Sequence, residues 1–477
     1  MRQTSSQFVA NAHAALHDAE LQPVLNAVAL FLPAMRTGVL AQTPGFEAMR
    51  DYAVRMKDHT LEHLDSYLAD FEARVAGRGG QVHHAATAAD LNRIVTGICS
   101  AAGARRVIKG KSMVGEETAL NDALEAAGLE VTETDLGEYI IQQAGEPPSH
   151  IIAPALHKSR EQVAELFRAR HDLGERDLTQ VQGIVREARA VLRERFLAAD
   201  AGITGANCLV AETGSVMLVT NEGNGDLCST LPRVHIVVTG IEKLVPTLED
   251  AGALHRVLCR SATGQVTSVY TTFYSGPRGA ADPDGPEEFH VVLLDNGRRT
   301  LLEGKYRSML RCIRCGACLN HCPIYRHVGG HAYGWVYPGP MGSVLTPLLG
   351  GLEHARELPN ACTACGRCEE ACPMRIPLPE HLRQLRDDAA AQGLTPPVWR
   401  AGIAAMMTLF RFPALYRVAA ALGRPLLGWL SSHPVLLAKL PLLSGWAAGR
   451  RLPVPQGHTF LGHWQKVHGA RDGEQRL

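Results

Sequence analysis

CIRCGACLNHCP at residues 312–323 recurs 50 residues later as CTACGRCEEACP at residues 362–373. Both stretches read C-x2-C-x2-C-x3-C-P, a pattern in which three thiolates bind one [4Fe-4S] cluster and the fourth binds the neighbouring cluster. The predicted ligands of the first cluster are Cys312, Cys315, Cys318 and Cys372. The predicted ligands of the second are Cys362, Cys365, Cys368 and Cys322.

The spacing has a physical reason, because two residues between ligands let a tight loop direct successive sulfurs at one cube. Gly316 and Gly366 occupy equivalent places in the two loops, where the missing Cβ lets the backbone approach the cluster. Two four-thiolate zinc sites are the alternative, but they leave the third regularly spaced thiol unexplained. The long insertion between Cys322 and Cys362 favours a helical cluster domain of the kind found in larger dehydrogenases.

The other four of the 12 cysteines, Cys99, Cys208, Cys228 and Cys259, are scattered, and we expect them to be small buried hydrophobic residues. The chain has 477 residues, 46% of them hydrophobic and 20% charged, as in globular proteins of two or three domains. The first 20 residues lack the apolar core of a secretory signal. These properties predict a cytoplasmic protein with metal or redox chemistry.

The first 75 or so residues have apolar positions at helical spacing. From about Gln81 to about Asn296, short apolar runs such as RRVIKG, SHIIAP, NCLVAE, VHIVVTG and FHVVLLD predict strands, with helical stretches between several of them. Strands that alternate with helices indicate an α/β domain with a largely parallel, buried sheet.

The C-terminal segment has no Asp or Glu between Pro396 and Ala470 and is basic. It holds four of the five tryptophans: Trp399, Trp429, Trp446 and Trp464. Aromatic groups among arginines suit a partner subunit, which we favour, or the surface of an anionic membrane. Prolines interrupt the apolar runs there, so we expect no transmembrane helix. Nucleic-acid binding is not expected, since no recognised fold motif accompanies the charge.

Three further stretches are distinctive: VIKGKSMVGEE (107–117), DLGEYIIQ with PSHIIAPALHK (135–158) and GITGANCLVAETGSVMLVTNEGN (202–224). Together with the paired cysteine motifs they resemble the lactate utilization protein B family along nearly the whole chain. The resemblance implies an α/β LUD domain with the fold of ribose-phosphate isomerases (RpiA), NagB and CoA transferases, a mainly helical ferredoxin domain with two clusters and a helical tail. The expected ranges are 1–75 (helical), 76–300 (LUD), 301–390 (ferredoxin) and 391–477 (tail).

The LUD fold analogy offers weak candidates for chemistry. Glu212 invites comparison with a transferase nucleophile, although a β-hairpin is the favoured interpretation of this stretch. A candidate anion-binding turn contains Gly214, Ser215, Asn221 and Gly223. Lys109 and Lys111 could face an anion but are more simply solvated. A general base could be among His83, His84, His150, His157 and His235, whose spacing favours none.

The resemblance implies an iron-sulfur electron-transfer subunit of a multi-subunit system that oxidises L-lactate to pyruvate. Its partners would be the other subunits and a quinone or another carrier, with peripheral contact to the inner face of the membrane left open. No G-x-G-x-x-G between a strand and a helix is present, so the two-electron step is expected in a partner. The alternatives are a catalytic LUD domain with regulatory clusters and a scaffold that the clusters stabilise.

Overall fold

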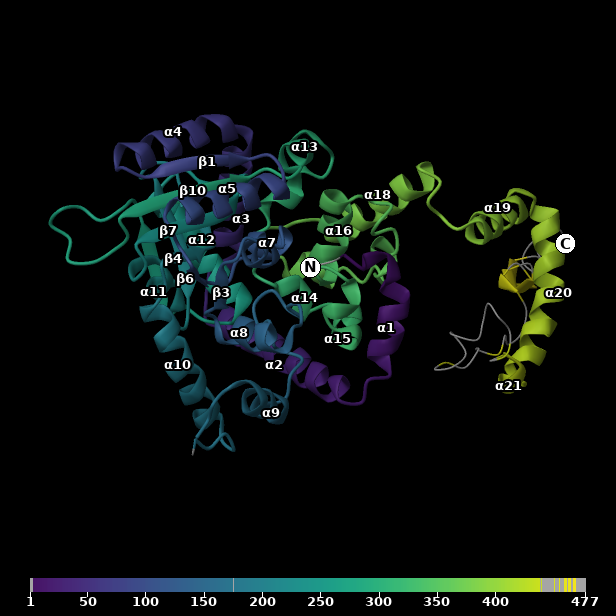
Figure 1. Cartoon of the computed structure of the whole chain (residues 1–477). Coiled ribbons are helices and arrows are strands. Elements are labelled where there is room, and N and C mark those ends of the chain that lie inside the picture. Colours follow the sequence, from purple (N-terminus) through teal and green to yellow (C-terminus); the bar gives the residue numbers. More distant parts are fainter. Residues whose placement is uncertain are drawn as a thin grey trace. The chain divides into compact units, whose positions relative to one another are not determined.

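The computed structural model describes residues 3–174, 176–437, 439, 450, 454, 459–460, 462–464 and 466–468. Contacts divide the chain into two units, Met1–Gln392 and Gly393–Leu477. The α/β domain and both cysteine motifs belong to the first unit (Figure 1).

A six-stranded, fully parallel sheet forms the centre of the α/β domain, as the sequence predicts. Its spatial order is β1 (Gln81–Ala85), β10 (Glu288–Leu294), β7 (Val234–Gly240), β4 (Ala201–Thr204), β2 (Arg106–Lys109) and β3 (Glu130–Glu133). Every residue of β4 and β7 is buried. Central strands of a parallel sheet are covered on both faces, which explains their continuous apolar runs.

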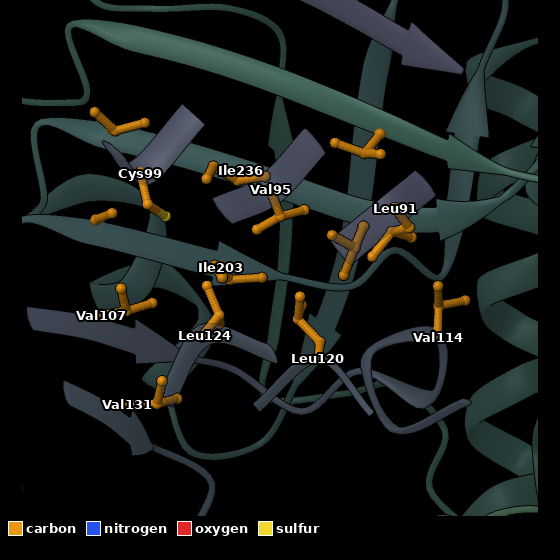
Figure 2. Close-up of a cluster of buried hydrophobic side chains, with 14 of the residues drawn as sticks. Leu91, Val95, Cys99, Val107, Val114, Leu120, Leu124, Val131, Ile203 and Ile236 are labelled. Carbon is orange, nitrogen blue, oxygen red and sulfur yellow. The ribbon is translucent and has the colours of Figure 1, made fainter. Parts of the chain in front are cut away.

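Successive residues of these strands enter different cores. Ile236 and Val238 pack beneath α5 (Ala88–Ala101) and α7 (Leu120–Ala126), whereas Val237 packs on the opposite face against α4 (Leu64–Gly77). Figure 2 shows the first of these cores, where Cys99 points toward the sheet among apolar side chains. Cys99, Cys208, Cys228 and Cys259 are all buried, as predicted.

A third core covers β2, which lies between β4 and the edge strand β3. Ile108 packs with side chains of α8 (Leu136–Ala144), α9 (Arg160–Arg170) and α10 (Val181–Leu197). Ser159 begins α9 with a capping box. The Ser159 side chain accepts a hydrogen bond from the backbone N–H of Gln162, and the Gln162 side chain accepts one from the backbone N–H of Ser159.

The strands of a second, four-stranded sheet are interleaved in sequence with those of the first. Its order is β8 (Leu244–Val245), β5 (Cys208–Val210), β6 (Ser215–Thr220) and β9 (Tyr270–Tyr274), and β5 and β6 form an antiparallel hairpin. The favoured β-hairpin interpretation of the Glu212 stretch is therefore confirmed. Helices α6 (Met113–Glu117), α11 (Asn224–Thr230), α12 (Leu248–Ala262) and α13 (Arg298–Glu303) complete the domain.

The N-terminal helices join the α/β domain to the cysteine-rich region. Here α1 (Phe8–Leu16) and α2 (Leu21–Ala41) contact α15 (Pro323–Val328), while α3 (Phe46–Glu62) contacts α12. The cysteine-rich region is helical, as expected: α14 (Ala317–Asn320), α15, α16 (Gly339–Gly350), α17 (Arg367–Ala371) and α18 (Leu378–Ala391).

The predicted strand in SHIIAP, residues 149–154, is wrong. This segment forms a turn, in which the His150 Nδ1 accepts hydrogen bonds from the backbone N–H groups of Ile152 and Ala153, each at 3.1 Å. The Ser149 N–H closes the turn on the Pro154 carbonyl at 3.0 Å. A side chain that satisfies two consecutive backbone donors removes the need for a neighbouring strand.

The second unit contains α19 (Pro397–Arg411), α20 (Pro413–Ser431) and α21 (Pro434–Leu437). Trp399 and Trp429 are exposed, whereas Trp446 lies outside the described residues. By length and composition alone, α2 could cross a membrane, as could α19 and α20 taken together despite their 110° bend. α2 contacts α12, α14 and α15, but only 11% of its apolar window is buried. Leu30 and Phe31 of this helix are exposed.

Candidate functional site

The two cysteine motifs adopt the same backbone course. Arg314 and Ala364, at equivalent positions, have φ angles of 59° and 54°. Two residues later in each loop, Gly316 and Gly366 have φ angles of 73° and 78°. Each loop then enters a short helix, α14 or α17. Two left-handed residues per loop turn the chain sharply enough to bring its cysteines to one side.

Four thiols line one cavity beneath the first loop: Cys312, Cys315, Cys318 and Cys372. They include three cysteines of the first motif and the last cysteine of the second. Burial, followed by the nearby Cys372, raises the pKa of Cys315 to about 12. The apolar remainder of the lining, including Met309, Met341, Ile376 and Leu378, excludes water.

The other four thiols also form a group. Burial, followed by Cys322, Cys362 and Cys365, raises the pKa of Cys368 to about 12. Cys365 is exposed, whereas Cys322 and Cys368 are buried. Each motif therefore contributes its last cysteine to the neighbourhood of the other motif.

Backbone N–H groups point at several of these sulfurs. The Sγ atoms of Cys322 and Cys372 accept from Tyr325 N at 3.5 Å and Ile376 N at 3.4 Å. Hydrogen bonds to sulfur stabilise the thiolate form that binds iron. Among the described residues, no three His, Cys, Asp or Glu side chains converge so as to hold one metal ion. The donors and the apolar lining fit a cluster that is bound by four thiolates.

A larger cavity of about 290 Å³ lies at the carboxyl ends of the central strands. Residues that follow β2, β4 and β7 line it, among them Lys111, Asn207 and Lys243. Ligands of parallel α/β sheets bind at this edge. Ile313 and Arg314, between two cysteines of the first motif, form another part of the wall. The candidate site therefore combines the LUD sheet with the cysteine loop.

Charged side chains meet beneath this wall in a buried network. Arg298, only 1% exposed, donates to Glu117 at 2.8 and 3.0 Å and to Glu242 at 2.8 Å. Arg314 lies 3.7 Å from Glu242 and 4.8 Å from the ring centre of Tyr337. Burial alone would raise the pKa of Glu242, but Arg298 and then Arg314 outweigh it and lower that pKa to about 2.

The far end of the cavity is acidic. The Lys111 Nζ donates to the Ile152 carbonyl at 2.7 Å, and burial lowers its pKa although Asp135 and Glu222 are near. Burial and then Asp135 raise the pKa of Glu222. Behind this end, burial would lower the pKa of Lys109, but its ion pairs with Glu133 (2.7 Å) and Glu116 (3.2 Å) raise it. Lys109 is thus a buried structural cation rather than a solvated one.

The proposed anion turn is not brought together. Asn221 lines the cavity, but Ser215 is at the other end of β6, about 20 Å away at 3.3 Å per residue. Gly214 packs against the backbone at Val75, and Gly223 packs against Tyr270. Glu212 accepts from the backbone N–H of Leu248 at 3.1 Å, outside the cavity lining.

None of the five histidines lines the cavity. Their partners are structural: His83 contacts His290, His84 pairs with Glu72, His150 meets Asn320, His157 lies between Ser149 and Glu146, and His235 meets Thr204. Burial lowers the pKa of His150 to about 4 and that of His235 to about 3. The residues that sequence reasoning missed are Lys243, Arg314 and Tyr337, and only the place of Arg314 between two cysteines could have pointed to one of them.

Comparisons with known proteins agree with this architecture. A family model described as the LUD domain matches residues 68–294, and one described as a 4Fe-4S dicluster domain matches residues 308–376. The crystal structure of a duf162 family protein from Deinococcus radiodurans is 18% identical, with a TM-score of 0.27, and covers 49% of this chain and 98% of that one. That similarity is too low to support a further argument.

Curated relatives match most of the chain. The uncharacterized electron transport protein YkgF of Escherichia coli is 43% identical over 427 residues, which cover 90% of this chain and 89% of that protein. Lactate utilization protein B of Shouchella clausii is 45% identical, and that of Geobacillus kaustophilus is 43% identical, each match covering 90% of both chains. With its LUD domain followed by a 4Fe-4S dicluster domain, this chain belongs to the lactate utilization protein B family.

Proposed function

We propose that this chain is the iron-sulfur electron-transfer subunit of a multi-subunit system that oxidises L-lactate to pyruvate, and that it binds two [4Fe-4S] clusters. The observation that carries the proposal is the cavity lined by Cys312, Cys315, Cys318 and Cys372. Its fourth thiol comes from the second motif, which is the crossed arrangement of paired cubane clusters. The names of the relatives associate those proteins with electron transport and with lactate utilization.

The two groups of cysteines would hold the two clusters of the electron relay. Cys312, Cys315, Cys318 and Cys372 would hold the inner cluster, and Cys322, Cys362, Cys365 and Cys368 the outer one. Each cluster supplies one-electron redox chemistry when it is bound. The Arg50 guanidinium donates to the Cys372 carbonyl at 2.6 Å and also pairs with Glu47 at 2.8 Å. Arg50 would therefore hold the backbone of the fourth ligand of the inner cluster in place.

Exchange with partners would take place at the outer group, because Cys365 is the exposed member. Oxidation of L-lactate releases two electrons and two protons, so we assign that step to a partner subunit with a two-electron acceptor. The basic, tryptophan-containing tail would contact such a partner. A cytoplasmic location, with a quinone or another carrier as the final acceptor, remains part of the proposal.

The test is anaerobic purification followed by iron and sulfide analysis and electron paramagnetic resonance of the dithionite-reduced protein. About eight iron and eight sulfide per chain are expected, with interacting signals from two clusters. Cys365→Ser should disturb the outer cluster, and Cys315→Ser should disturb the inner one.

Cys99→Ala is the matched control, since it removes a buried thiol from the α/β core and should keep the full iron content. Zinc in place of iron, or a full iron count in both motif variants, would refute the cluster assignment. In the assembled complex, lactate should reduce the clusters; clusters that lactate leaves oxidised would favour the scaffold alternative.

A further inference from the structure

The larger cavity and the thiol-lined cavity share part of a wall. Ile151, Ile313 and Arg314 line both of them. The two spaces are therefore separated by one layer of residues, which includes the backbone between Cys312 and Cys315. A molecule in the larger cavity would lie close enough to the inner cluster position to affect it electrostatically.

Cationic groups gather at this shared wall. Lys243 lines the cavity, and it forms no hydrogen bond or ion pair with another residue in the described part of the chain. Its electrostatic neighbours include Arg314, Glu242 and the thiol of Cys312. Arg298 carries one positive charge and pairs with both Glu117 and Glu242, so Arg314, 3.7 Å from Glu242, completes the balance of these two carboxylates. Lys243 thus leaves an excess positive charge facing the cavity.

Arg314 is held in place by strong constraints. Its left-handed backbone, with a φ of 59°, is uncommon for a residue with a side chain, and its guanidinium lies over the Tyr337 ring. The Tyr337 hydroxyl in turn donates to Glu117 at 2.6 Å. An arginine fixed in this way presents its N–H groups to a ligand with little loss of side-chain entropy.

We propose that this cavity binds a small organic carboxylate, with the carboxylate group between Lys243 and Arg314, one residue layer from the Cys312–Cys315 loop. The volume of about 290 Å³ is at the lower limit of small-molecule sites, which span about 300–1,000 Å³. The carboxylate class rests on the proposed function, in which lactate is oxidised in a partner subunit, so the cavity is a binding site and not the site of oxidation. The placement rests on the cavity and its charges.

The acidic end of the cavity does not compete with this placement. Asp135 and Glu222 are electrostatic neighbours of Lys111, whereas the neighbours of Lys243 are Arg314 and Glu242.

The test is calorimetric titration of the anaerobic, cluster-loaded full chain with L-lactate, pyruvate, lactamide and inorganic phosphate. Saturable binding of L-lactate or pyruvate is expected, with lactamide at least tenfold weaker because it lacks the charge. Lys243→Gln should weaken carboxylate binding at least tenfold, about 1.4 kcal/mol, while Lys243→Arg should stay within a few-fold of the unaltered chain.

Lys305→Gln is the matched control, because it removes a half-exposed ammonium that pairs with Asp388 away from the cavity. The proposal would be overturned if the unaltered chain showed no saturable carboxylate binding, or if lactamide bound as tightly as L-lactate. It would also be overturned if phosphate bound more tightly than both carboxylates, or if Lys243→Gln kept the affinity of the unaltered chain. Binding should also change the resonance spectrum of the reduced protein, and an unchanged spectrum at saturation would overturn the placement beside the inner cluster.

Failure of the two proposals can be told apart. A full iron count without carboxylate binding removes this inference alone. Carboxylate binding with zinc or no metal at the cysteines removes the proposed electron relay and leaves the site.

Discussion

Replacement of Arg298 by methionine tests how the LUD domain supports the cysteine loop. The guanidinium lies between two buried carboxylates, Glu117 and Glu242, and bonds both. Arg298→Met keeps much of the volume but leaves these carboxylates without their main counter-charge. Glu117 would retain the Tyr337 hydroxyl and the Asn296 amide. Glu242 would retain the longer contact with Arg314 and the electrostatic influence of Lys243.

The expected loss is large, because removal of one partner of a buried ion pair costs about 3–5 kcal/mol. At about 2.1 cal/mol/K per residue, the 392-residue first unit has an unfolding entropy of about 0.8 kcal/mol/K. The corresponding fall in Tm is roughly 4–6 °C. Part of this cost comes from uncompensated carboxylates, so it should shrink when Glu117→Gln is already present.

Differential scanning calorimetry of the cluster-loaded chain at neutral pH measures the change. Arg299→Met is the matched control: Arg299 pairs at 2.7 Å with Asp65, but the two side chains are 48% and 78% exposed. Exposed pairs are worth at most about 1 kcal/mol, so the control should move Tm by about 1 °C or less. Equal shifts in the two variants would refute the assignment of Arg298 as the central buried charge.

Three further predictions follow from particular contacts. The lowered pKa of Glu242 contributes stability that is complete above the ordinary pKa of 4.5 and is lost as pH falls toward 2. The difference in Tm between the unaltered chain and Glu242→Gln should therefore become smaller below about pH 4.5. A difference that does not change with pH would contradict this prediction. Glu212→Ala should leave iron content and lactate-dependent reduction intact, because Glu212 lies outside the cavity lining; lost turnover with intact clusters would favour a catalytic LUD domain. Gly202→Ala should lower Tm strongly, because the added Cβ would lie 1.8 Å from the Cys228 carbonyl oxygen. Gly252→Ala is the control: this helical position has open space around it, so the substitution should add about 0.5–1 kcal/mol of stability in the same scans.

The family, the α/β class and the helical cysteine region could be predicted from the sequence, because their signals are local. Continuous apolar runs mark buried parallel strands such as β7, and the spacing of thiols within one loop reports its ligand geometry directly. Where a local pattern is ambiguous, the prediction fails. SHIIAP has the composition of a strand, but the side chain of His150 satisfies the backbone there and makes a turn.

Only the tertiary structure decided where the candidate ligand cavity lies. Asn221 and Ser215 are six residues apart, yet an extended strand holds them at opposite ends, whereas Lys243 and Arg314 are 71 residues apart and line one cavity. Residues that meet at the edge of a parallel sheet come from separate crossover connections, so their proximity has no local signature in the sequence. The buried charges that orient Arg314 are likewise contributed by distant segments, and each would be unfavourable without the partners that the fold supplies.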